Sequence, residues 1–129
     1  MQQDGSFVAN PYSWNKNATM IWIDSPVGTG FSYVKDDDYA SDEKTIANDL
    51  YTAVYAILFT KYPQFASNPF YIFGESYAGK YVPWLASTVL ANNASPKSKA
   101  KINLKAIGIG NGYVEPYYQT GSCTSTLKL

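Results

Sequence analysis

Ser76 is the residue of this chain best suited to nucleophilic chemistry. It stands within the segment 74–79, Gly-Glu-Ser-Tyr-Ala-Gly, directly after the apolar run 70–73. A short apolar strand followed by Gly-x-Ser-x-small and a helical pattern is typical of a nucleophile elbow, which lifts a serine hydroxyl clear of a sheet. Gly74 and Ala78 leave room for such a tight turn, because larger side chains there would collide with the neighbouring backbone.

The base that such a serine needs is missing from the chain. A serine hydroxyl becomes a nucleophile at neutral pH when an adjacent base takes its proton, and the usual base is histidine. None of the 129 residues is histidine. Cys123 is the only cysteine, so it has neither an internal disulfide partner nor a histidine for cysteine-based catalysis. We predict an unpaired or buried thiol; in a secreted protein its partner would lie outside this chain.

The composition indicates one packed domain over residues 1–129. Ten basic residues balance ten acidic ones, which gives no electrostatic support for binding nucleic acid or an anionic membrane surface. Aromatic residues make up 16% of the chain, which favours a packed, enzyme-like domain over a disordered one. No apolar run approaches the ~20 residues that span a bilayer, and the first six residues do not resemble a signal peptide.

We expect no metal and no cofactor. No cluster of histidine and cysteine offers a zinc site. Two segments, 28–33 and 108–113, begin Gly-x-Gly, but neither has the third glycine of a dinucleotide-binding fingerprint. Tight turns at strand ends explain both.

The elements needed to position Ser76 alternate between strand and helix. Apolar runs predict strands at 18–24, 69–73 and 104–109. A helix capped by Ser41 is predicted to end at Pro63. Its apolar face comprises Ile46, Leu50, Ala53, Val54, Ile57 and Leu58.

A second helix is predicted to start near Ser76 or Tyr77. Pro83 lies inside its pattern and predicts a kink or a restarted helix. Its buried stripe comprises Val82, Leu85, Ala86, Val89 and Leu90. The tail after Pro116 is polar and has no pattern that predicts an element.

Strands joined by long crossovers imply an α/β fold with a mostly parallel sheet and flanking helices. In such sheets the functional residues gather at the carboxyl ends of the strands. Asp24, Ser76 and Asn111 each follow a predicted strand. We therefore expect them to lie along one edge of the sheet.

Two triplets match the acceptor pattern for N-glycosylation, beginning at Asn17 and Asn93. Asn93 falls in the polar stretch 92–101, which predicts an exposed loop that could carry a glycan. Asn17 abuts a predicted buried strand and is the less favoured of the two.

Four segments, in this order and spacing, resemble the serine carboxypeptidase family of α/β-hydrolases. They are 10–16, 24–33, 74–83 and 108–112, and the resemblance extends from residue 10 to about residue 119. It implies a partial, incomplete α/β-hydrolase fold from the N-terminal half of such an enzyme. It also implies serine-type carboxypeptidase chemistry, peptide substrates with a free C-terminal carboxylate, and a secreted, lysosomal or vacuolar location.

The resemblance implies a role for each matching residue of the elbow. Ser76 would be acylated by the substrate, and the backbone N–H of Tyr77 would be one oxyanion-hole donor. Glu75 would help to bind the terminal carboxylate of the peptide. Two carboxylates attract only if they share a proton, which predicts an acidic optimum for the intact enzyme.

The chain also departs from the family pattern. The upstream Asn-Gly-Gly-Pro-Gly-Cys segment, which supplies a second oxyanion donor, has no counterpart here. A hydrolase triad runs Ser, Asp, His along the chain, so Asp24, which precedes Ser76, is predicted to be structural. Two alternatives therefore stay open: an acyltransferase that uses small molecules, and a chain that is catalytically inert.

Overall fold

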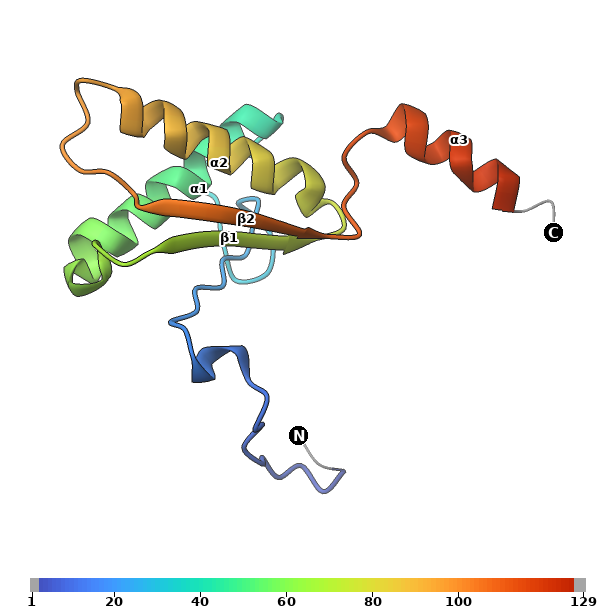
Figure 1. Ribbon diagram of the computed structural model, residues 1–129, viewed down its shortest axis with the longest axis horizontal. Helices are drawn as coiled ribbons and strands as arrows, with labels where there is room; N and C mark the ends of the chain where they lie inside the picture. Colours follow the sequence, from blue (N-terminus) through green and yellow to red (C-terminus); the bar gives the residue numbers. More distant parts are fainter. Residues whose placement is uncertain (1–2, 127–129) are drawn as a thin grey trace.

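The structure is a computed structural model that describes residues 3–126. Its central unit is two parallel strands joined by a crossover helix, which confirms the predicted α/β class (Figure 1). The helices and strands, in chain order, are α1 Glu43–Ala56, β1 Phe70–Glu75, α2 Ala78–Ala94, β2 Leu104–Gly110 and α3 Pro116–Thr126.

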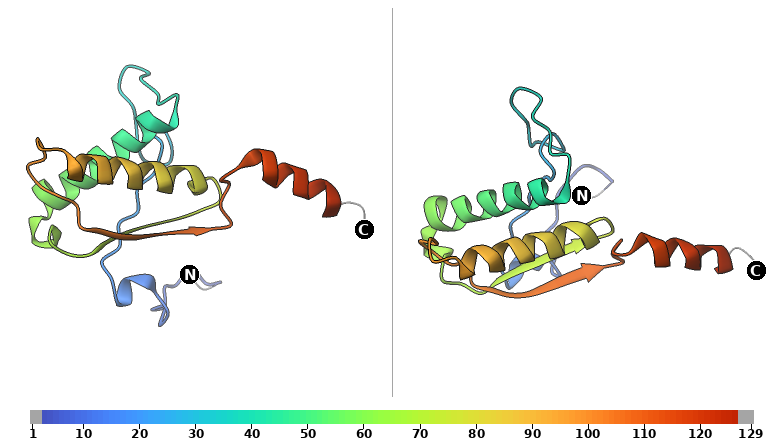
Figure 2. Two further views of the ribbon diagram at one scale, coloured as in Figure 1. Left: turned by 45° about the horizontal axis from the view of Figure 1, so that its top comes forward. Right: turned by 90° about the horizontal axis from the view of Figure 1, so that it is seen from above.

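Helix α2 packs on one face of the sheet, and α1 runs beside α2 in the same direction (Figure 2). The core lies between these elements because their apolar stripes face one another. Its buried members are Val54, Leu58, Ile72, Val82, Leu85, Ala86, Val89 and Ile102. The other face of the sheet is open: Tyr71 is 50% exposed and Phe73 is 74% exposed.

Asp42, rather than the predicted Ser41, caps α1. The Asp42 carboxylate accepts a hydrogen bond from the backbone N–H of Thr45 at 2.8 Å and another from the Thr45 hydroxyl at 3.0 Å. Asp42 is the residue three positions before Thr45, which is the spacing that a capping side chain needs. The end predicted at Pro63 is confirmed, since a π-helical turn, Ile57–Lys61, extends α1 almost to that proline.

Helix α2 runs unbroken through Pro83, so the predicted restart is wrong. Proline removes one N–H, the one that would bond to the carbonyl of Gly79, and the loss is confined to the first turns. Buried Val82 and Leu85 hold the helix against the core on either side. The predicted buried stripe is confirmed except for Leu90, which is 59% exposed because Val89 fills the core at that level.

The predicted strand at 18–24 does not form. Trp22, within this segment, is 68% exposed, and the segment pairs with neither strand of the sheet. The chain instead turns at Asp24, whose carboxylate accepts the N–H of Phe31 and whose carbonyl accepts the Ser32 hydroxyl, both at 2.8 Å. Such local bonds compete with sheet pairing. They confirm a structural role for Asp24.

Asn93 lies in the last turn of α2 and not in an exposed loop, so that prediction is wrong. Its side-chain amide donates to the carbonyl of Ile102 at 2.7 Å and accepts the N–H of Ile102 at 3.0 Å. The pair joins the end of α2 to the start of β2. Asn17 is exposed and ends a short 3-10 helix, Trp14–Lys16, so it does not abut a buried strand.

The tail forms a helix, α3, that projects away from the sheet (Figure 1). The Gln119 side chain ties its first turn to the preceding loop. Its carbonyl oxygen accepts hydrogen bonds from the N–H groups of Val114 and Glu115, and its amide donates to the carbonyl of Gly112 at 2.7 Å.

Cys123 lies within α3, but its side chain is outside the described part. Among the described helices, none has the length and apolarity required to cross a membrane.

Candidate active site

Ser76 occupies a strained turn between β1 and α2. Its φ is +59°, in the left-handed region that residues other than glycine rarely adopt. A Cβ atom at Gly74 would lie 2.3 Å from the Cβ of Ala78 and 3.0 Å from Val82. This confirms that Gly74 and Ala78 allow the turn to be tight, and the result is an exposed serine at the end of a strand.

The loop after β2 fixes the backbone of Ser76. The Ser76 N–H donates to the carbonyl of Gly110 at 3.0 Å, and its carbonyl accepts the N–H groups of Gly79 at 3.0 Å and Tyr113 at 2.8 Å. A Cβ at Gly79 would lie 2.7 Å from the Tyr113 backbone, so only glycine allows this approach. Ser76 and Asn111 therefore share one edge of the sheet as predicted, whereas Asp24 does not follow a strand.

The backbone N–H of Tyr77 has no hydrogen-bond partner within residues 3–126. Tyr77 immediately precedes α2, and Ser76 and Tyr77 are both exposed. The N–H groups at a helix N-terminus lack intrahelical partners and favour negative charge. This donor is therefore free to meet an anionic oxygen that forms beside Ser76.

Glu75 ends β1 and lies opposite Gly110 of β2. Its side chain is exposed, so Glu75, Ser76 and Tyr77 form three consecutive exposed residues at the carboxyl edge of the sheet. The arrangement brings together a serine hydroxyl, a backbone N–H and a carboxyl group. It lacks the usual base, since the sequence contains no histidine.

Two side chains near the elbow have roles that the sequence did not indicate. The Tyr77 phenol donates to Oε1 of Glu43 at 2.7 Å, and this bond is the main cause that raises the pKa of Tyr77. Lys80 donates from Nζ to the carbonyl of Val114 at 2.8 Å. Both contacts span 34 residues, so no local pattern signals them.

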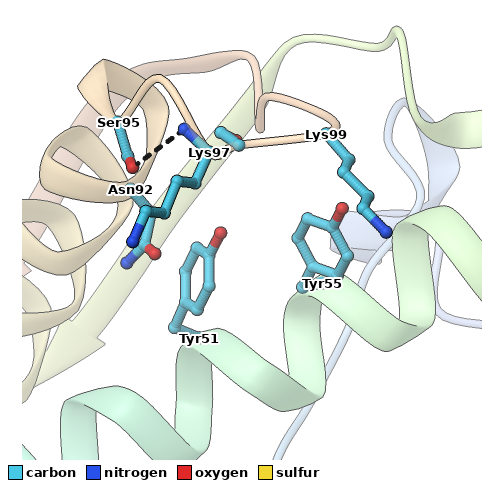
Figure 3. A pocket seen from close by; sticks show the side chains of 7 residues that line it. Tyr51, Tyr55, Asn92, Ser95, Lys97 and Lys99 are labelled. Carbon is cyan, nitrogen blue, oxygen red and sulfur yellow. Dashed lines mark hydrogen bonds between the residues drawn. The ribbon is translucent and has the colours of Figure 1, made fainter.

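A separate cavity of about 300 Å³ lies at the end of α2 opposite the elbow (Figure 3). Tyr51 and Tyr55 project into it from α1, and burial raises the pKa of Tyr51. Lys97 and Lys99 border it from the exposed loop after α2. It contains none of the elbow residues, and the described residues include no group of His, Cys, Asp and Glu that could hold a metal ion.

A positive-φ serine between a parallel strand and its crossover helix defines a nucleophile elbow of the α/β-hydrolase class. The family model described as serine carboxypeptidase matches residues 1–127. The chain belongs to the serine carboxypeptidase family.

Individual relatives agree with this assignment. The chain is 48% identical over 114 residues to serine carboxypeptidase S10 family member 1 of Dictyostelium discoideum, covering 88% of this chain and 26% of the relative. It is 39% identical over 127 residues to the pheromone-processing carboxypeptidase KEX1 of Phytophthora infestans, covering 92% of this chain and 21% of the relative. The chain thus spans about a quarter of the length of these relatives.

A solved structure also matches the fold. The crystal structure of KEX1(delta)P, a prohormone-processing carboxypeptidase from Saccharomyces cerevisiae, superposes with a TM-score of 0.62 at 28% identity. The match covers 81% of this chain and 24% of that one. The chain therefore has part of an α/β-hydrolase fold.

Proposed function

We propose that this chain carries the nucleophile of a serine carboxypeptidase that removes C-terminal residues from peptides. The observation that carries the proposal is Ser76, held exposed at positive φ beside the unpartnered N–H of Tyr77. The family supports the reaction class. Two of the relatives named above process a pheromone and a prohormone, which supports peptides as substrates.

In this mechanism Ser76 Oγ attacks the carbonyl carbon of the last peptide bond while a base accepts its proton. The carbonyl oxygen becomes an oxyanion that accepts a hydrogen bond from Tyr77 N–H, and one such donor contributes about 3 kcal/mol to transition-state stabilisation. The C–N bond breaks as the leaving amine takes the proton. Water then hydrolyses the acyl-serine and regenerates Ser76.

Glu75 gives the reaction its requirement for a free C-terminus. Its exposed carboxyl group lies next to Ser76 and can share a proton with the terminal carboxylate of the substrate. That pair forms only when one proton is retained, so the activity should fall as the pH rises. The same family likeness supports a secreted, lysosomal or vacuolar location and, by analogy, glycosylation.

A second candidate is a chain that is catalytically inert by itself. The supporting observation is the absence of histidine, which leaves Ser76 without the usual base. An acyltransferase that passes the acyl group to a small molecule would use the same elbow. It differs only in the acyl donor and acceptor.

Added imidazole can supply the missing base in an experiment on this chain. The acyl donor would be an N-blocked depsipeptide whose C-terminal hydroxy acid keeps a free carboxylate, matched by the same ester with that carboxylate amidated. Peptide mapping by mass spectrometry would locate the acyl group. Ser76→Ala is the test variant and Ser87→Ala, an exposed serine on α2, is the matched control.

The proposal predicts imidazole-dependent acylation at Ser76 that is lost in Ser76→Ala, kept in Ser87→Ala, and faster with the free carboxylate. Equal acylation rates with both esters would contradict the proposed carboxypeptidase activity, but they would still support Ser76 as the nucleophile. An acyl-glucose is tested as a third donor. Faster acylation of Ser76 by the acyl-glucose than by either ester would favour the acyltransferase. Acylation spread over lysines and tyrosines, without enrichment at Ser76, would support the second candidate, a catalytically inert chain.

A further inference from the structure

The cavity at the carboxyl end of α2 lies between a helix and a loop. Tyr51 and Tyr55 belong to α1, one turn apart, and their hydroxyl groups point toward the loop that follows α2 (Figure 3). The side chains of Lys97 and Lys99 come from that loop and flank the two phenols (Figure 3). Two ammonium groups and two hydroxyl groups therefore border one hollow of about 300 Å³.

These four donor groups are available to a ligand. Neither the phenol oxygens of Tyr51 and Tyr55 nor the Nζ atoms of Lys97 and Lys99 have a hydrogen-bond or ion-pair partner among the described residues. Burial raises the pKa of the Tyr51 phenol, so this group stays neutral and keeps a proton that it can donate.

The surroundings of the cavity are basic. Between Glu75 and Glu115 the sequence contains no acidic residue, whereas lysines occupy positions 97, 99, 101 and 105. Asp49 of α1 borders a different hollow, together with Leu50 and Ala53. The described residues that line the cavity include no carboxylate, so the cavity favours an anion over a cation.

The loop that carries the two lysines is held in place by hydrogen bonds of its own. Ser95 Oγ accepts the N–H of Lys97 at 3.3 Å (Figure 3), and Ser98 Oγ donates to the carbonyl of Ala100 at 2.7 Å. The two hydrogen bonds described above, between the end of α2 and the start of β2, close the loop. Its backbone is thus ordered before a ligand binds, which lowers the entropic cost of binding.

The donors and the size of the cavity indicate a phosphate monoester. A phosphate group on an ester carries a charge of about −1.5 to −2 at pH 7, which two lysines can match. Its three terminal oxygens point in different directions, so donors from the helix and from the loop can each bind one of them. Small-molecule sites typically measure about 300–1,000 Å³, so this cavity suits a small ester whose organic part packs on the tyrosine rings.

We propose that this cavity binds the phosphate group of a small phosphate monoester. Lys97 and Lys99 pair with its charge, and the phenols of Tyr51 and Tyr55 donate hydrogen bonds to its oxygens. None of these residues takes part in the peptidase mechanism proposed for Ser76, so the two proposals can fail separately.

The experiment is an NMR titration of the 129-residue chain, labelled with 15N and with 13C at the Cζ carbon of tyrosine. The probe is glucose 6-phosphate, and glucose is the matched compound without phosphate. Both are added at constant ionic strength, because exposed lysines attract any anion at low salt.

Three variants separate the cavity from its surroundings. The double variant Lys97→Gln, Lys99→Gln removes both charges, and Tyr51→Phe removes one phenol and identifies its signal. Lys101→Gln is the matched control, because Lys101 is an exposed lysine of the same loop that does not line the cavity.

Glucose 6-phosphate should shift the Tyr51 and Tyr55 signals and the amides of 95–99 along one saturating curve, and glucose should shift none of them. The double variant should bind at least about tenfold more weakly, and Tyr51→Phe about threefold to tenfold more weakly, since each loses hydrogen bonds to a charged group. Lys101→Gln should change the affinity by less than about twofold.

The absence of a saturating shift would overturn the proposal, as would equal shifts with glucose. Equal losses of affinity in Lys101→Gln and in the double variant would also overturn it, because the lysines would then act only as diffuse charge. Phosphatidylcholine vesicles with and without phosphatidic acid form a second arm. Binding that requires phosphatidic acid, without binding of glucose 6-phosphate, would assign the site to a lipid headgroup and overturn the small ester.

Discussion

The unit formed by β1, α2 and β2 and the segment 18–33 both carry serine carboxypeptidase motifs, yet only the first folds as its sequence predicts. In the unit, Ile72, Val82 and Val89 are buried and the elbow is bonded to the loop after β2. In the segment, Trp22 is 68% exposed and Phe31 is 99% exposed.

The difference lies in where the partners of each region are. The strands of the unit pair with each other, α2 covers one face of them, and α1 packs against α2, so the buried residues of the unit have partners within 43–113. Residues 18–24 have no strand beside them in the described part. A motif therefore acquires its structure only together with the elements against which it packs.

The largest contrast is expected from truncating one apolar side chain in each region. Ile102→Ala removes a side chain that is 1% exposed and should lower the free energy of unfolding by about 2–5 kcal/mol. Trp22→Ala, in the unpaired segment, should change it by less than about 0.5 kcal/mol. Urea unfolding followed by circular dichroism measures both; a similar loss in the two variants would show that 18–24 is packed.

Glycine at the elbow gives the next contrast. Gly79→Ala places a Cβ 2.7 Å from the Tyr113 backbone and should cost about 1–3 kcal/mol, as overpacking does. At Gly121 in α3 a Cβ meets nothing within 4 Å, so Gly121→Ala should be neutral or stabilising. Equal melting temperatures for the two variants would contradict the tight contact between the turn and the loop after β2.

The asparagines of the two glycosylation triplets give a third contrast, because Asn93 is in the unit and Asn17 comes just before the segment. Asn93→Ala removes two hydrogen bonds to Ile102 and should cost about 1–3 kcal/mol, whereas Asn17→Ala should be near neutral. Because the Asn93 amide is engaged, we now expect Asn17 to be the glycosylated residue. In a secretory host, a glycan mass that is lost in Asn93→Gln and kept in Asn17→Gln would reverse this expectation.

The strain at Ser76 should appear as a difference between two small replacements. Glycine tolerates the φ of +59° without steric cost, whereas alanine does not. Ser76→Gly should therefore be more stable than Ser76→Ala by about 1 kcal/mol. Thermal unfolding of the pair measures the difference, and a more stable alanine variant would mean that the turn is not left-handed.

The smallest expected effect is the pH dependence of the cap on α1. The hydrogen bond from the Thr45 N–H lowers the pKa of Asp42 below 3.8. A carboxyl group whose pKa is lower in the folded state stabilises the fold at pH values above its unfolded-state pKa. That stabilisation is lost as the pH falls through the folded-state pKa. Asp42→Asn should flatten the loss of stability below pH 3.8, and Asp38→Asn in the exposed loop should not. Identical acid curves for the two variants would refute the cap.

The sequence was sufficient for those parts of the site that depend on neighbours along the chain. Gly74 and Ala78 flank Ser76, so the tight turn and the exposed serine could be predicted, and the stripe from Val82 to Val89 predicted the covering helix. The contacts of Glu43 with Tyr77 and of Lys80 with Val114 could not be predicted. Each joins residues 34 positions apart and leaves no periodic pattern.

Hydrolysis of an N-blocked dipeptide by the unmodified chain, without added imidazole, tests the central claim most directly. The elbow is formed, but we propose that Ser76 has no base within this chain. We therefore predict no hydrolysis above that of Ser76→Ala at any pH. Hydrolysis that disappears in Ser76→Ala would contradict it, because some other group of this chain would then activate the serine.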